Sequence, residues 1–62
     1  MKITEIERVP WLRLEMVERE GMLYYRVIHN HTGYIQYQGK DYHFVRDWMY
    51  QEERKYSQNS YK

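Results

Sequence analysis

The sequence of 62 residues contains no cysteine, only one proline and only three glycines. Without cysteine the chain can form no disulfide, which excludes the disulfide-stapled scaffolds that are common among secreted domains of this size. We therefore expect one small domain, residues 1–62, that folds in a reducing, cytoplasmic setting. A domain of this length buries only about 60% of the surface of its unfolded chain, so its core must be small.

Long apolar runs are absent as well. No segment approaches the roughly 18 apolar residues that a membrane-spanning helix needs, and residues 1–10 lack the apolar stretch of a signal peptide. Neither sign of charge is in large excess, because the chain contains ten Lys and Arg and nine Asp and Glu. Mixed charge produces no long-range field that draws a protein onto nucleic acid. We expect no association with membranes.

Aromatic side chains are what the sequence has in excess. It contains eight tyrosines, two tryptophans and one phenylalanine, together 18% of the residues. A core as small as this one cannot enclose so many rings, so several must lie at the surface. Tyr and Trp are enriched in binding surfaces because their rings offer a large apolar area together with a polar group.

Two strands are predicted in the first half of the chain. Alternation of apolar and polar residues from Trp11 to Val17 is typical of a half-buried strand. A second strand, from about Met22 to His29, is rich in β-forming residues. Residues 1–9 fit either a short helical turn or an edge strand, because Ile3, Ile6 and Val9 recur at every third position.

A hairpin is predicted after the second strand. Residues 30–33, Asn-His-Thr-Gly, fit a turn with Gly33 in the left-handed conformation. In this register Val27 pairs with Tyr37 and His29 pairs with Ile35. The third strand, residues 34–38, carries no charge and would be adhesive if it lay at a sheet edge.

The C-terminal third allows two interpretations. In the first, which we favour, residues 41–46 form a fourth strand and Asp47 caps a helix. In the second, the helix begins at Asp41 and the C-terminal third adds no strand. The apolar face of that longer helix would consist of Val45, Trp48, Met49 and Tyr56. Both give an α+β fold, a small antiparallel β-meander of three to four strands followed by one C-terminal helix, with a frayed tail over residues 57–62.

Metal binding and catalysis find little support in the sequence. His29, His31 and His43 would supply the nitrogen ligands of a zinc site, but His31 falls in the predicted turn and His43 on the opposite sheet face from His29. His43 and Asp47 form the best acid–base pair, yet no nucleophile lies in a recognisable motif and the chain is too small for a typical ligand pocket. We expect no enzyme, no metal and no cofactor.

The surface aromatics instead predict a non-enzymatic protein that binds and modulates a larger protein partner, or pairs with a second copy of itself. Small cysteine-free chains of this type include accessory and inhibitor proteins of phages and mobile elements. The expected partner-binding residues, on the sheet face opposite the helix, are Trp11, Tyr24, Arg26, Tyr34 and His43. If the helix covers that face, the role passes to Tyr25, Tyr37 and Tyr42.

Binding of single-stranded nucleic acid is the alternative. A sheet face with Tyr24, Tyr34 and Arg26 offers rings on which unpaired bases stack. Phosphate binding usually requires a cluster of Lys and Arg, however, and here Glu15, Glu18 and Glu20 dilute the positive charge. We therefore favour a protein partner.

Overall fold

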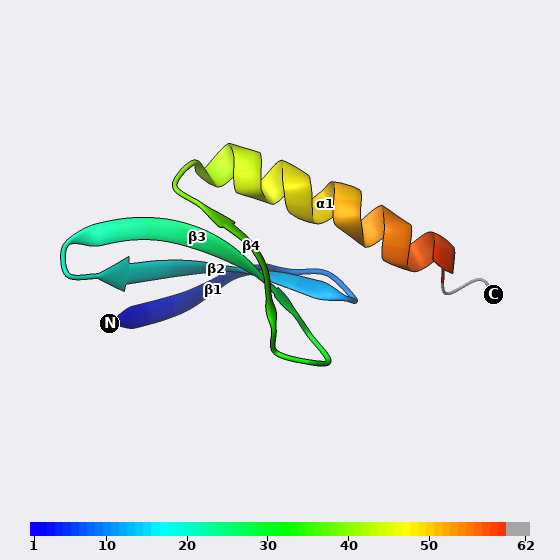
Figure 1. Ribbon diagram of the computed structural model, residues 1–62, viewed down its shortest axis with the longest axis horizontal. Coiled ribbons are helices and arrows are strands. Elements are labelled where there is room, and N and C mark those ends of the chain that lie inside the picture. The colour runs from blue at the N-terminus through cyan, green and yellow to red at the C-terminus, as the bar shows by residue number, and fades with distance from the viewer. Residues whose placement is uncertain (60–62) are drawn as a thin grey trace.

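Four strands and one helix make up the fold, which the computed structural model describes for residues 1–59 (Figure 1). The elements are β1 (Lys2–Arg8), β2 (Leu12–Arg19), β3 (Met22–His29), β4 (Ile35–Gly39) and α1 (Tyr42–Asn59). The strands form one antiparallel sheet in the order β1-β2-β3-β4. The predicted meander with one C-terminal helix is therefore confirmed. Residues 57–59 are helical, where a frayed tail was expected, and residues 60–62 lie outside the described residues.

Strand β1 resolves the ambiguity of the N-terminal segment, which is an edge strand. Its pairing with β2 shifts register between Glu5 and Glu7, so Ile6 has no partner. A bulge of this kind changes the face on which later side chains lie. Ile3 pairs with Val17 on one face of the sheet, whereas Val9, just beyond β1, packs against the core. The bulge therefore explains why apolar residues recur at every third position in a segment that is extended and not helical.

The helix begins earlier than expected. The main-chain N–H of Phe44 donates to Oδ1 of Asp41 at 3.2 Å, and that of Val45 donates to its carbonyl oxygen at 3.0 Å. Asp41 is thus the N-cap. The expectation of a strand over residues 41–46 with Asp47 as the cap is wrong. Burial decides the outcome, because Val45 and Met49 are one helical turn apart and both are almost fully buried.

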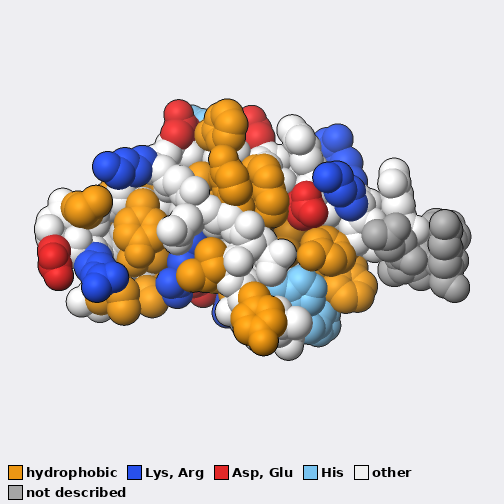
Figure 2. Space-filling view, viewed as in Figure 1, with side chains coloured by type: hydrophobic (Ala, Val, Ile, Leu, Met, Phe, Trp, Pro, Cys, Tyr) orange, Lys and Arg blue, Asp and Glu red, His pale blue; other side chains and the backbone are white. Residues whose placement is uncertain are grey.

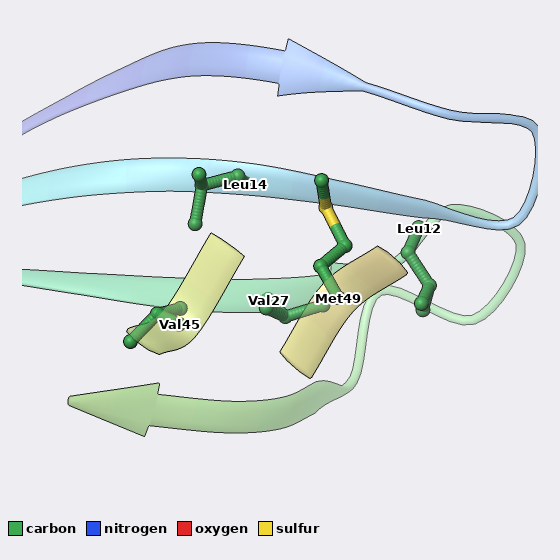
Figure 3. Packing of buried hydrophobic residues seen from close by; sticks show 5 residues of the cluster. All are labelled: Leu12, Leu14, Val27, Val45 and Met49. Carbon is green, nitrogen blue, oxygen red and sulfur yellow. The ribbon is translucent and has the colours of Figure 1, made fainter. Parts of the chain in front are cut away.

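One face of the sheet carries the core. Helix α1 contacts β2, β3 and β4, and its buried side chains point toward the sheet (Figure 3). The central cluster consists of Leu12, Leu14, Val27, Val45 and Met49. Partly buried rings surround this cluster, among them Trp11, Tyr25, Tyr37 and Trp48. Some of the many aromatic side chains therefore enlarge a core that contains few aliphatic residues.

The register of β4 differs from the expected one at a single point. Val27 pairs with Tyr37, as predicted. The predicted pairing of Ile35 with His29 is wrong, because Ile35 pairs with Ile28 and the register shift leaves Gln36 without a partner. Since paired residues of adjacent strands lie on the same side of a sheet, the shift moves Ile35 to the face opposite α1.

The cap at Asp41 predicts a measurable contribution to stability. Asp41→Ala should lower the free energy of unfolding by about 1 kcal/mol, because the N–H of Phe44 loses its side-chain acceptor. Urea unfolding followed by circular dichroism measures this change. Asp47→Ala is the matched control, since Asp47 is exposed and lies inside the helix. An equal loss in both variants would contradict the assignment of the cap.

Candidate functional site

The face of the sheet opposite α1, which we call the open face, is defined by the strand register. Residues that pair directly across antiparallel strands lie on the same side. The open face comprises Arg13, Glu15, Val17 and Arg19 of β2, their partners Ile28, Arg26, Tyr24 and Met22 of β3, Ile3, Glu5 and Arg8 of β1, and Ile35 and Gln38 of β4. No element among residues 1–59 packs over this face, because the helix lies on the other side.

A carboxylate held by two arginines lies at the centre of the open face. Oε2 of Glu15 accepts a hydrogen bond from Nε of Arg13 at 2.9 Å, and Oε1 accepts one from Nε of Arg26 at 2.8 Å. Only 8% of Glu15 is exposed. Burial by itself would raise the pKa of this carboxyl, but the hydrogen bonds from Arg13 and Arg26 outweigh it and hold the pKa of Glu15 below its usual range. The carboxylate therefore remains charged and neutralises part of the arginine charge.

Asn30 extends this network to the turn between β1 and β2. Its Oδ1 accepts hydrogen bonds from the guanidinium groups of Arg13 at 3.2 Å and Arg8 at 3.3 Å. Its Nδ2 donates to the carbonyl oxygens of Val9 at 2.8 Å and Leu12 at 3.1 Å. The sequence indicated Asn30 only as a turn residue. No local pattern reveals that its amide joins the end of β3 to a turn about twenty positions earlier.

Exposed apolar side chains surround the charged centre. Ile3 is 43% exposed, Met22 52% and Ile35 51%, and Met22 shares this face because it pairs with Arg19. Tyr24 is half-buried. Val17 and Ile28, by contrast, are almost completely buried by their neighbours. The open face thus contains two buried apolar side chains, a group of paired charges and a rim of exposed apolar side chains.

The predicted partner-binding residues do not all share this face. Tyr24 and Arg26 lie on it, and Tyr34, 72% exposed, lies directly before β4. Trp11 instead stacks on Tyr56 of α1 with ring centroids 5.8 Å apart, and His43 lies exposed in the first turn of α1. The expectation of one common face is therefore wrong for Trp11, which lies in the turn before β2, and for His43, which is helical.

The alternative set of tyrosines, Tyr25, Tyr37 and Tyr42, lies where the helix packs on the sheet. Tyr25 packs against Tyr42 with ring centroids 5.4 Å apart, and Tyr37 stacks on Trp48 at 4.7 Å. All three tyrosines pack against the core cluster. Tyr25 and Tyr37 thus occupy the covered face of the sheet and Tyr42 belongs to the helix that covers it, so the three are not offered to a partner as a set.

Two of the three histidines belong to an aromatic cluster at the C-terminal end of α1. His29 lies 5.4 Å from Tyr56 and 5.7 Å from His31, measured between ring centroids. In Figure 2 most of the visible histidine surface adjoins apolar side chains. Nδ1 of His29 accepts the main-chain N–H groups of His31 and Thr32, each at 3.2 Å, so this nitrogen is occupied by the turn. Among residues 1–59 no group of three or more His, Asp or Glu side chains is placed to hold a metal ion.

No family model, curated protein or solved structure matches this chain. Within the described part of the chain, no helix is both long and apolar enough to cross a membrane. The functional argument therefore rests on the chemistry and placement of the side chains.

The network at Glu15 predicts a pH dependence of stability. Because its pKa is lowered in the folded state, Glu15 stabilises the fold above its unfolded pKa, and this stabilisation is lost as the pH falls through the folded pKa. Glu15→Gln should cost roughly 1.5–3 kcal/mol near pH 7, the range for hydrogen bonds to a charged group. The difference between variant and wild type should shrink toward pH 3 in urea titrations.

Glu52→Gln is the matched control for Glu15→Gln. Glu52 pairs with Lys55 at 3.5 Å on the exposed side of α1, where the lysine side chain is 70% accessible. Pairs of this kind contribute roughly 0–1 kcal/mol. A difference between Glu15→Gln and wild type that does not change with pH would contradict the role assigned to Glu15.

The amide of Asn30 predicts a second stability effect. Asn30→Ala should destabilise the protein by roughly 1–3 kcal/mol, because the carbonyl oxygen of Val9 loses the Asn30 donor and that of Leu12 keeps only the main-chain N–H of Val9. Thermal or urea unfolding measures the loss. Gln36→Ala serves as the control, since the exposed Gln36 amide only reaches the carbonyl oxygen of Tyr34, at 3.4 Å. Equal stability of the two variants would count against a stabilising role of the hydrogen bonds between Asn30 and the β1–β2 turn.

Proposed function

We propose that this protein is a non-enzymatic binding protein that uses its open face to bind and modulate a larger protein partner. The observation that carries the proposal is the exposure of Ile3, Met22 and Ile35 around a charge network that is already paired. Apolar side chains exposed together on a small domain are typical of interaction sites. Tyr24 and Arg26, of types enriched in protein interfaces, lie on the same face.

The paired charges make this face suitable for burial. A charged group that loses water on binding must find a partner, or the complex is strongly destabilised. Arg13 and Arg26 already donate to Glu15, so a partner can cover them without supplying a carboxylate of its own. The central ion pairs then cost less to desolvate than isolated arginines would.

The balance between buried and exposed apolar groups supports the same proposal. In the described residues, seven apolar side chains are buried and eight large ones are exposed. A single exposed apolar residue needs no explanation, but here the exposed set exceeds the core. A protein of this kind acts by occupying a surface of its partner, as small cytoplasmic accessory or inhibitor proteins of phages and mobile elements do.

Binding of single-stranded nucleic acid has less support. A stacking platform requires cations that are free to neutralise phosphates. On the open face Glu15 accepts from both Arg13 and Arg26, and Glu5 accepts from Arg8 at 2.7 Å. These carboxylates compete with a phosphate for each of the three arginines.

Substitution of neighbouring residues on opposite faces tests the proposal. Met22→Asp should reduce capture of the partner from extracts of the source cells at least tenfold, because it places a charge within the apolar rim. Leu23→Asp should leave capture unchanged, since Leu23 pairs with Glu18 and therefore faces the other side of the sheet. Leu23 is 46% exposed and Met22 52%, so the two positions are matched.

A photo-reactive amino acid at position 24, in place of Tyr24, identifies the captured protein as a direct contact. Cross-links to one protein from position 24 but not from position 23 are the expected result. Equal loss of capture in Met22→Asp and Leu23→Asp, or no cross-linked protein at all, would contradict the proposal. Retention of single-stranded DNA with a steep dependence on salt would favour the nucleic-acid alternative.

A further inference from the structure

The two edge strands of the sheet differ in their content of charged residues. Strands β1 and β4 are the edge strands, and each presents main-chain N–H and C=O groups that no strand among residues 1–59 pairs on the outer side. The sequence of β1 contains two acidic and two basic residues, Glu5, Glu7, Lys2 and Arg8. That of β4, Ile-Gln-Tyr-Gln-Gly, contains no charged residue.

The charges of β1 oppose pairing with a second copy of the same strand. In a fully overlapped antiparallel pair of β1 strands, Glu5 of one copy lies opposite Glu5 of the other. In the same register Lys2 lies opposite Arg8. Like charges directly opposite each other destabilise a pair of strands, and charged edges are one means by which proteins avoid edge-to-edge association.

The corresponding pair of β4 strands brings no like charges together. With full overlap, Tyr37 lies opposite Tyr37 of the second copy, Gln36 opposite Gln38, and Ile35 opposite Gly39. Cross-strand aromatic pairs and amide pairs stabilise such an arrangement. The irregularity at Gln36 limits the regular part of the edge, so the affinity should be modest.

The surroundings of β4 supply apolar contacts to a second copy. The ring of Tyr37 stacks on that of Trp48, with centroids 4.7 Å apart, and on that of Phe44, with centroids 6.4 Å apart. Phe44 is nevertheless 63% exposed. A shallow hollow of about 190 Å³ on the same side of α1 is lined by Phe44, Asp47, Trp48 and Gln51. A chain that pairs with β4 therefore meets exposed aromatic surface beside the strand.

We infer that β4 pairs in antiparallel orientation with β4 of a second copy of this chain, which joins the two sheets into one across a two-fold axis. The charge pattern favours a second copy as the occupant, because the uncharged strand is complementary to itself whereas β1 is not. This dimer is independent of the proposed function, since it uses the edge of the sheet and leaves the open face accessible.

Charge substitutions at the edge test the inference in any register. The wild-type protein should show a monomer–dimer equilibrium in sedimentation experiments, with a dissociation constant on the order of 100 µM, as expected for a small interface. Gln36→Lys/Gln38→Lys places positive charges along both edges of the pair, and Gln36→Glu/Gln38→Glu places negative ones. Each variant alone should remain monomeric, and an equimolar mixture should dimerise at least tenfold more tightly than either.

Circular dichroism verifies that both variants are folded. A wild-type protein that stays monomeric up to about 1 mM, a concentration well above that expected for a small interface, would overturn the inference. So would dimers of the separate charged variants, which would place the interface elsewhere, or a mixture of folded variants that does not associate. Met22→Asp should lose capture of the larger partner and keep the dimer, because Met22 lies outside β4, whereas Gln38 pairs with Arg26 on the open face. Failure of the dimer and failure of the proposed function are thereby distinguished.

Discussion

The side-chain amide of Asn30 is the interaction on which the arrangement of the first three strands depends. One end of the amide donates to the β1–β2 turn, at the carbonyl oxygens of Val9 and Leu12, and the other accepts from Arg8 and Arg13. The main-chain N–H of Asn30 adds a hydrogen bond to Trp11 at 2.8 Å. The end of β3 is thereby fixed to the turn that separates the two preceding strands. The same turn contains Trp11, whose ring stacks on Tyr56 of α1. Asn30 therefore also helps to connect the sheet to the helix.

Much of the architecture follows from local patterns. Alternation in β2, the β-forming residues of β3 and the turn at Gly33 predict the hairpins, and Gly33 has the expected positive φ of 78°. Errors occur where a distant contact decides between two locally acceptable structures. Residues Tyr42 to Phe44 suit a strand by propensity, but burial of Val45 and Met49 against the sheet favours a helix from Asp41.

The candidate site is only partly accessible to sequence reasoning. Tyr24 and Arg26 are placed correctly because alternation holds throughout β3. Ile35 is misplaced because a bulge, which has no reliable sequence signal, reverses the face on which it lies. The pairing of Glu15 with Arg13 and Arg26 depends on the alignment of β2 with β3. That alignment is set by the turn between β2 and β3, in which Glu20 and Gly21 adopt positive φ.

The position of α1 on only one face of the sheet has an evolutionary consequence. The central apolar cluster lies between the helix and the sheet, whereas the side chains proposed to recognise a partner lie on the other side of the sheet. A substitution at Ile3 or Met22 creates no cavity, so selection can change these residues with little loss of stability. Val17, Ile28 and Glu15, which are buried on the open face, restrict this freedom. The proposed binding surface can therefore change in sequence while the core remains constant.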